Sequence, residues 1–343
     1  MYRRKVNMII SIKGCWVITV MLICITLSVT NLASAKSIIS GECYYLQRDG
    51  ASESLVYKEG SDQNFGNIRY FAASNDMYQA WTRARLDDLR LQLDTADEIY
   101  REILGLVPPL DMPRYHQADF IMANLLAGRG RGGKAYDEVV RSAINRECHI
   151  RMALGGQVNP AKNLTPAHEL FHMYLNAYMM FKQAWLQEGL ARWSEGLFSG
   201  RMQNEEILPA KAEALETLLS KSYDAASFWQ RLFYLVDFKS KIDTPTAIRD
   251  RRYLDGSRVV SSTELYGGGF IAWLFESLCE TSALLAQQHQ WPKYGWPEAE
   301  QHSPDHNWAI LSAIHNAVVS YVPENEQSDE LRAFMRLIAS RLD

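Results

Sequence analysis

A pair of histidines four positions apart constrains this chain more than any other feature. Segment 165–195 reads TPAHELFHMYLNAYMMFKQAWLQEGLARWSE and contains His168, Glu169 and His172 in the pattern HExxH. Positions four apart share one face of a helix, so both imidazoles can point at one cation, and zinc suits such ligands. Glu169 lies about 100° around the helix and is placed to act on a water held by that cation.

The same segment predicts two consecutive helices. Thr165 is expected to cap the first helix and Pro166 to begin it. The run MYLNAYMMF is apolar on nearly every side, so we expect this helix to be buried. Buried imidazoles and carboxylates are costly to desolvate unless a cation pairs with them. The run WLQEGLARWSE predicts a second helix that carries Glu188, with Glu195 two turns further on and facing the same way.

Together these motifs resemble the gluzincin metallopeptidases, which carry HExxH and then a glutamate ligand in a W-L-x-E-G-x-A context. The resemblance implies that His168, His172 and Glu188 bind one Zn²⁺ ion and that Glu169 is the general base and acid. It also implies that Glu195 is the partner of a ligand histidine, which would fix that ring's tautomer. The alternative for Glu195 is a solvated helix residue. The spacing from His172 to Glu188 is a few residues shorter than in the best-known members.

A third segment, LYGGGFIAWL, resembles the Y-x-x-G-F arrangement of the aminopeptidase branch through Tyr266, Gly269 and Phe270. The resemblance implies that Tyr266 donates a hydrogen bond to the oxyanion that forms when water attacks an amide. The alternative is a tyrosine that packs on glycines at a helix start. The segment GGQVN is faintly similar to the aminopeptidase motif GxMEN, but Val158 stands where the amine-binding glutamate would be. We interpret GGQVN as a turn, and the missing carboxylate counts against an aminopeptidase.

Residues 1–35 are typical of an export signal. Four basic residues and no acidic ones accompany the apolar run CWVITVMLICITLSV, which is shorter than the roughly 20 residues of a membrane-spanning helix. Ala33, Ser34 and Ala35 form a small-residue cleavage site before Lys36. We therefore expect a periplasmic or secreted protein that is not stably inserted in a membrane. An uncleaved signal that tethers the chain is the less favoured alternative.

Charge and cysteine content restrict the partners and the compartment. The chain has 36 basic and 40 acidic residues, so loss of the four basic residues in the signal leaves 32 against 40. This negative balance argues against nucleic acid and anionic membranes as partners. Cys43, Cys148 and Cys279 remain after cleavage, which allows at most one internal disulfide and leaves a free thiol.

The fold class we expect is α+β. A zincin-like lobe at 36–182 would contain a mixed sheet and end in the HExxH helix, and a mostly α-helical lobe at 183–343 would carry Glu188. Apolar periodicity predicts a helix over 77–106, and strand-like runs occur at 115–125 and 148–154. A small β-containing entry precedes them at 36–75. The later helices are expected at 208–221, 225–237, 263–280, 307–322 and 326–342.

Three other segments have plainer interpretations. The glycine-rich loop 128–133 lacks the GK[ST] ending of a phosphate-binding loop, so we interpret it as a flexible hairpin or edge loop. The polar stretch 238–262 could be a lid or a mobile surface loop. His302 and His306 are four apart, but Pro304 lies between them, so a second metal site there is disfavoured.

The function that the sequence favours is an exported zinc metallopeptidase, an endopeptidase in preference to an exopeptidase, that acts on peptides or proteins. An aminopeptidase-like exopeptidase is one alternative, with Glu195 or Arg252 as candidate anchors for a peptide terminus. A zinc-binding protein of gluzincin fold that acts as a binding or assembly factor is the other. The sequence carries no sign of the oligomeric state.

Overall fold

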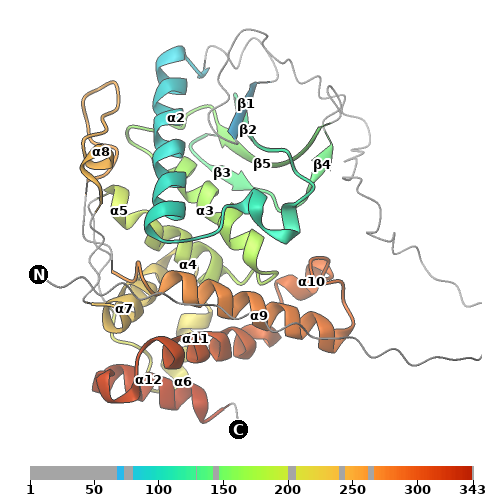
Figure 1. The fold of residues 1–343 in the computed structure, drawn as a ribbon, viewed down its shortest axis with the longest axis vertical. Helices are drawn as coiled ribbons and strands as arrows, with labels where there is room; N and C mark the ends of the chain where they lie inside the picture. Colours follow the sequence, from blue (N-terminus) through green and yellow to red (C-terminus); the bar gives the residue numbers. More distant parts are fainter. Residues whose placement is uncertain are drawn as a thin grey trace, which may run out of the picture. The chain divides into compact units, whose positions relative to one another are not determined.

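The sheet is small and mixed, and helices make up more than half of the residues that the structure describes (Figure 1). This computed structural model describes residues 68–72, 80–128, 130–141, 147–199, 206–238, 244–261 and 266–341, which all belong to one compact unit. The expected export signal and Cys43 lie outside the described residues. The expected mixture of sheet and helices is confirmed.

Three parallel strands form the body of the sheet, in the order β1 (Ile68–Ala72), β2 (Phe120–Leu126) and β5 (Cys148–Gly155). Strands β2 and β5 are rich in apolar residues and buried at most of their positions, as strands covered on both faces are. On the other side of β5 lie two short antiparallel strands, β3 (Gly133–Ala135) and β4 (Val140–Arg141). The sequence predicted β2 and β5 but not β3 and β4, which are too short to show a pattern of their own.

Helix α2 (Arg83–Glu98) continues into a π-helical turn at Ile99–Ile103, so the helix expected over 77–106 ends three residues early. Leu89, Leu93 and Ala96 of α2 are fully buried, and α2 packs against α3 (Thr165–Tyr178), the helix with the HExxH motif. Of the strand expected over 115–125, residues 120–125 are confirmed as part of β2. Tyr115 instead ends a 3₁₀ turn (Pro113–Tyr115), which follows another such turn at Pro109–Asp111.

The start of α3 differs from the expectation. Leu164 occupies the cap position without a side-chain hydrogen bond, and Thr165 is already the first helical residue, so its prediction as the cap was wrong. The Thr165 amide donates to Asn163 Oδ1 at 2.7 Å, and the Ala167 amide donates to Gln92 Oε1 of α2 at 3.2 Å. A neighbouring loop and a neighbouring helix therefore satisfy amides that a capping side chain would otherwise bind.

The second half of the described chain is helical. The longer helices are α4 (Ala184–Ser194), α6 (Ala212–Leu219), α7 (Ala226–Val236), α9 (Ile271–His289), α11 (Asn307–Tyr321) and α12 (Asp329–Ala339); the shorter ones are α5 (Gly196–Ser199), α8 (Thr246–Arg249) and α10 (Glu298–Gln301). The helix expected at 263–280 begins only at Ile271, because Gly267 has a φ of +87° and the residues before Ile271 form a turn. Short 3₁₀ turns lie at Tyr223–Ala225, Pro304–His306 and Glu324–Glu326.

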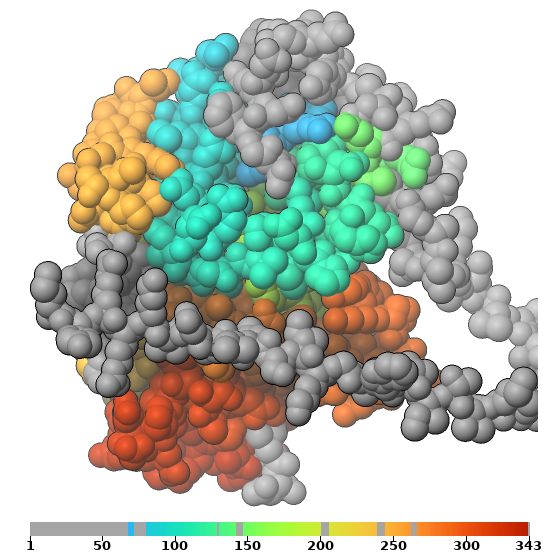
Figure 2. Space-filling model, viewed as in Figure 1, coloured from blue at the N-terminus to red at the C-terminus, as the bar shows by residue number. Residues whose placement is uncertain are grey.

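The polar segment 244–261 is attached to α2, beside which it lies in both whole-molecule views (Figures 1 and 2). Arg251 Nη2 forms an ion pair with Glu98 Oε2 at 2.6 Å, and the Leu254 amide donates to Asp88 Oδ1 at 2.8 Å. The sequence left open whether the stretch 238–262 is a lid or a mobile surface loop. In the structure, segment 244–261 of this stretch is bound to α2.

Two further expectations concern cysteines and membranes. Cys148 is disulfide-bonded and Cys279 is a free thiol, which agrees with one bridge and one unpaired thiol. Within the described ranges, none of the helices combines the length and the apolar character needed to cross a membrane.

Candidate metal centre

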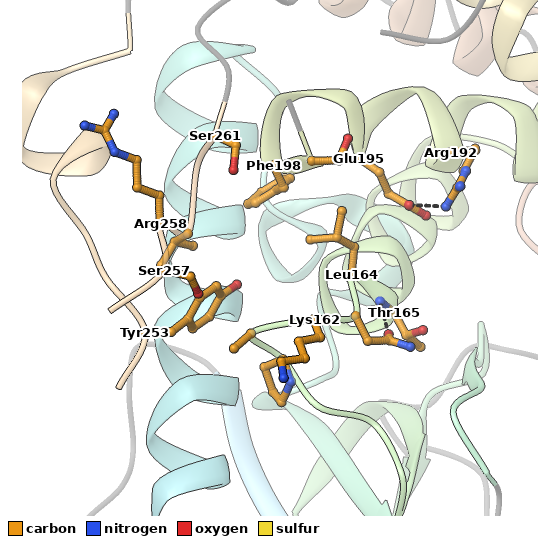
Figure 3. Close-up of a pocket in the computed structure, with 15 residues that line it drawn as sticks. Lys162, Leu164, Thr165, Arg192, Glu195, Phe198, Tyr253, Ser257, Arg258 and Ser261 are labelled. Atoms are coloured by element: carbon orange, nitrogen blue, oxygen red, sulfur yellow. Dashed lines mark hydrogen bonds and ion pairs between the residues drawn. The ribbon is translucent and has the colours of Figure 1, made fainter. Parts of the chain in front are cut away.

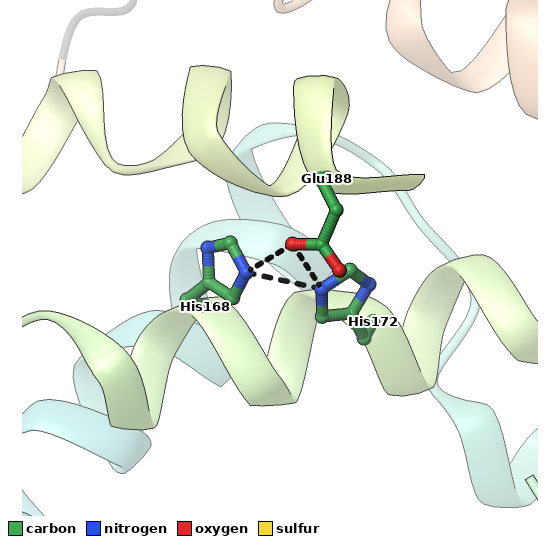
Figure 4. Close-up of side chains that lie close together, drawn as sticks. All are labelled: His168, His172 and Glu188. Atoms are coloured by element: carbon green, nitrogen blue, oxygen red, sulfur yellow. Dashed lines mark hydrogen bonds and ion pairs between the residues drawn. The ribbon is translucent and has the colours of Figure 1, made fainter. Parts of the chain in front are cut away.

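Three side chains from two helices meet at one point (Figure 4). His168 and His172 project from α3, and Glu188 reaches them from α4. The Nε2 atoms of the two histidines are 3.0 Å apart. Glu188 Oε2 lies 3.1 Å from Nε2 of His168 and 3.4 Å from Nε2 of His172. The structure therefore brings together the three residues that the sequence proposed as metal ligands.

These distances fit a bound metal ion. Ligand atoms about 2.0–2.1 Å from a tetrahedral zinc ion lie roughly 3.3 Å from one another. The three observed separations, 3.0, 3.1 and 3.4 Å, are close to that value. Two imidazole nitrogens and one carboxylate oxygen also leave the fourth position of such an ion open to water or substrate. The group could thus hold a metal ion, and its donor atoms suit zinc.

The glycine after Glu188 explains how α4 is held in place. A β-carbon on Gly189 would lie 2.8 Å from Trp229 Nε1 and 2.9 Å from the β-carbon of Ala225. Without it, α4 packs closely on α7, and Trp229 Nε1 donates to the Trp185 carbonyl at 3.0 Å. This contact fixes α4, and with it Glu188, over the histidines.

Each ligand histidine has a second partner on its Nδ1 atom. His168 Nδ1 lies 2.8 Å from Oε1 of Glu195, whose other oxygen accepts from Arg192 (Figure 3). Glu195 is only 8% exposed, so the alternative that it is a solvated helix residue is wrong. His172 Nδ1 lies 3.3 Å from Oε1 of Gln187. The oxygen atoms of Glu195 and Gln187 can thus orient the rings of His168 and His172, respectively.

The charges around His168 favour a cation. Burial acts to lower the pKa of His168, but hydrogen bonds to Glu188 and Glu195 outweigh it and raise that pKa to about 9. Burial likewise acts to raise the pKa of Glu188, yet the hydrogen bonds from His168 and His172 hold it well below its usual range. Two carboxylates thus stabilise positive charge at this point, whether a proton or a metal ion supplies it.

Glu169 lies against the edge strand β3. Its side chain is 7% exposed, and the backbone of Ala135 hydrogen-bonds to its carboxylate. Burial raises the pKa of Glu169 above its usual range, although the two histidines act in the opposite direction. A carboxylate with a raised pKa is a better proton acceptor than a solvated one, which is what a general base requires.

A cavity of about 410 Å³ connects these groups. The residues that line it come from β3 and the segment after it, from α3, α4 and the connection between them, from the 3₁₀ turn at Tyr223–Ala225, and from α10 and its C-terminal cap. They include His168, Glu169, His172, Glu188 and Asn176. A substrate in this cavity would therefore reach the three candidate ligands and Glu169 together.

The structure places Tyr223 at this cavity, and Tyr266 is not among the residues that line it. Tyr266 packs edge-on against Tyr234, with ring centroids 4.9 Å apart. The ring of Tyr223 stacks on His168 at 5.7 Å, and its hydroxyl hydrogen-bonds to Glu188. Burial and the charge of Glu188 raise the pKa of Tyr223 to about 12. No sequence motif marks Tyr223, so sequence reasoning missed it.

The other proposed sites look different in the structure. Arg252 donates to the carbonyls of Arg249 and Arg251 at 2.9 and 3.0 Å and does not line the cavity. His302 does line it, but within the described residues His302 and His306 belong to no metal-binding group; they pair with Glu298 and Glu300. Glu195, Arg258 and Tyr253 line a second cavity of about 540 Å³ (Figure 3).

Comparisons with known proteins found no match: no protein-family model, no curated protein and no solved structure matches this chain.

Proposed function

We propose that this protein is an exported zinc metallopeptidase of the gluzincin type that cleaves internal peptide bonds. The observation that supports the proposal is the convergence of His168, His172 and Glu188, with Glu169 beside them, on a single cavity. An edge strand next to the HExxH helix, followed by helices that include the Glu188 helix, is compatible with a zincin-like arrangement of two lobes.

In the proposed reaction, zinc held by the three ligands would polarise the substrate carbonyl and make water more acidic. Glu169 accepts a proton from the attacking water as the water oxygen bonds to the carbonyl carbon. Glu169 then delivers that proton to the amide nitrogen, and the carbon–nitrogen bond breaks. The products are one carboxylic acid and one amine. Because burial raises its pKa, Glu169 is suited to both transfers.

Tyr223 is the candidate donor to the carbonyl oxygen. The phenol is protonated at neutral pH even at its ordinary pKa, and its stacking on His168 places it at the ligand cluster. In the structure its hydroxyl is bound to Glu188, so it would exchange that partner for the substrate oxygen as negative charge develops. This assignment replaces Tyr266, which the cavity does not include.

Internal cleavage is favoured over release of terminal residues. Both residues that could have anchored a peptide terminus are engaged elsewhere: Glu195 binds His168 and Arg192, and Arg252 binds backbone carbonyls. An exopeptidase of this chain would need a different anchor.

The test is zinc content and cleavage of a mixed peptide library by the purified chain from Lys36 onward, compared with Glu169→Gln. We expect both proteins to bind one zinc per chain and only the wild type to cleave. Glu138→Gln is the matched control, because Glu138 is another carboxylate that lines the same cavity and it is exposed. The cleavage products identify internal or terminal cutting.

Two results would count against the proposal. If wild type and Glu169→Gln both bind zinc and neither cleaves any of the peptides, the binding or assembly factor becomes the better interpretation. If neither protein binds zinc, the ligand assignment itself is wrong.

A further inference from the structure

We infer that Gln187 is a positioning residue that fixes which ring nitrogen of His172 faces the metal. The inference rests on the proposed zinc centre and concerns a residue that no motif marks. Gln187 immediately precedes the ligand Glu188 on α4, and it is 6% exposed. A buried amide next to a ligand must satisfy its own polar atoms, and the way it does so determines the hydrogen bonds it offers.

The orientation of the Gln187 amide follows from its second partner. Gln187 Nε2 lies 2.7 Å from the carbonyl oxygen of Phe181, in the connection between α3 and α4. A backbone carbonyl can only accept, so the amide nitrogen must be on that side. The amide oxygen Oε1 then faces His172, 3.3 Å from Nδ1.

The orientation of the amide in turn fixes the tautomer of His172. An amide oxygen can only accept, so Nδ1 of His172 must carry the hydrogen. In a neutral imidazole the other nitrogen, Nε2, then has the lone pair. That nitrogen lies 3.4 Å from Glu188 Oε2 and points to the proposed metal position. The carbonyl of Phe181 orients the Gln187 amide, and the Gln187 amide oxygen then accepts from Nδ1 of His172. These two hydrogen bonds leave Nε2 of His172 free to bind the metal.

The two histidines are oriented by groups of different charge. The partner of His168 Nδ1 is the carboxylate of Glu195, and the partner of His172 Nδ1 is a neutral amide. Glu169, Glu188 and Glu195 already bring three carboxylates to this site. A neutral acceptor at position 187 orients the second ring without adding a fourth buried carboxylate, whose desolvation would be costly.

The competing explanation is purely structural: Gln187 would only hold the α3–α4 connection through Phe181. Gln183, one turn earlier, provides a matched control, because it is also 6% exposed and its Nε2 donates to the Ser303 carbonyl at 2.7 Å. Replacing either glutamine with methionine removes a buried side chain-to-backbone hydrogen bond and keeps a similar volume. Only the substitution at Gln187 also removes the partner of His172.

The experiment measures the zinc dissociation constant by chelator competition, and the melting temperature of the metal-free protein, for wild type, Gln187→Met, Gln187→Glu and Gln183→Met. Loss of an orienting partner weakens metal binding about 10- to 100-fold in other sites, so we expect that loss for Gln187→Met. Gln183→Met should bind zinc as tightly as the wild type does. Its melting temperature should fall by about as much as that of Gln187→Met, because both variants lose a buried hydrogen bond to a backbone carbonyl. Gln187→Glu supplies an acceptor for His172 and should bind zinc more tightly than Gln187→Met. It also loses the donor to the Phe181 carbonyl and adds a fourth carboxylate, so its metal-free form should melt at a lower temperature than the wild type.

A second measurement needs no variant. Nitrogen NMR of zinc-loaded, ¹⁵N-histidine-labelled wild type should show His172 protonated on Nδ1 and metal-bound through Nε2. Zinc bound through Nδ1 of His172, or a Gln187→Met affinity equal to that of Gln183→Met, would overturn the inference while leaving the proposed function intact. Absence of zinc binding by the wild type would overturn both.

Discussion

Gly133 lies so close to Glu169 that a β-carbon on Gly133 would stand 2.5 Å from both Cγ and Oε1 of the glutamate. Gly133 begins β3, which pairs with β5 through Gly133–Leu154 and two further residue pairs. The glycine therefore allows the edge of the sheet to approach the proposed general base, and the backbone of Ala135 can then bind the carboxylate. The position of Glu169 depends on this contact as much as on its own helix.

Gly133→Ala should therefore lower peptide cleavage about 100-fold, because misplacing a catalytic group by about 1 Å can have that effect. The φ of Gly133 lies outside the left-handed region, so alanine fits the backbone. The effect arises from the clash with Glu169 and with Cγ2 of Thr165, which would lie 2.7 Å from the β-carbon. The three atoms nearest to a β-carbon on Gly133 belong to Glu169 and Thr165, not to the zinc ligands, so zinc content should stay at the wild-type value. Steady-state kinetics and metal analysis of the purified variant provide the check.

Gly128→Ala is the matched control for this prediction. Gly128 lies in the same glycine-rich stretch, and a β-carbon there would meet no atom within 4 Å. The variant Gly128→Ala should cleave peptides at the wild-type rate. Equal activities of the two variants would show that the approach of β3 does not position Glu169.

Tyr223→Phe should lower kcat about 100- to 1,000-fold with little change in KM, as expected when a donor to the developing oxyanion is removed. The phenylalanine keeps the ring that stacks on His168 at 5.7 Å, so the packing is preserved. Tyr266→Phe is the control, because Tyr266 packs on Tyr234 and does not line the cavity. A loss of kcat in Tyr266→Phe, with Tyr223→Phe unaffected, would return the donor role to Tyr266.

The parts of the site that the sequence predicted share a local origin. His168, Glu169 and His172 lie on one helix, so helical geometry alone relates them. Glu188 follows on the next helix, which a short connection holds against the first. The long helices and the apolar strands β2 and β5 were predictable for the same reason, since a repeating pattern along a short stretch of chain determines each of them.

The parts that the sequence did not predict depend on contacts between distant segments. Strand β3 has three residues, and it exists because it pairs with β5 and packs against Glu169. Tyr223 reaches the cavity because Gly189 lets α4 approach the 3₁₀ turn that begins at Tyr223. Neither relationship leaves a pattern in the local sequence.

Stability should depend on pH through His149, which is unrelated to the metal. Its ring is 2% exposed and stacks on Phe120 at 5.1 Å. Burial lowers the pKa of His149 to about 4, below its ordinary value of 6.5, and the charges of Arg151 and Arg69 act in the same direction. Between these two values the unfolded chain binds more protons than the folded one, so stability falls as the pH drops from 6.5 towards 4.

His149→Phe should remove this part of the acid sensitivity. The free energy of unfolding in urea, compared between pH 7 and pH 4.5, should fall by about 2 kcal/mol less in the variant than in the wild type. His116→Phe is the control, because His116 is exposed. The same pH dependence in the wild type and His149→Phe would contradict the assignment.

Removal of the metal should destabilise the protein, because the proposed ligands join α3 to α4 and two carboxylates, Glu188 and Glu195, meet at His168. Zinc at about 1,000 times its dissociation constant adds roughly 4 kcal/mol to the stability of a protein that binds it only when folded. Treatment with EDTA should therefore lower the melting temperature by about 10 °C, and added zinc should restore it. His172→Ala, which removes one ligand, should melt at nearly the same temperature with and without EDTA. A wild-type melting temperature that does not respond to EDTA and zinc would show that no metal ion bridges α3 and α4, and the bound positive charge would then be a proton on His168.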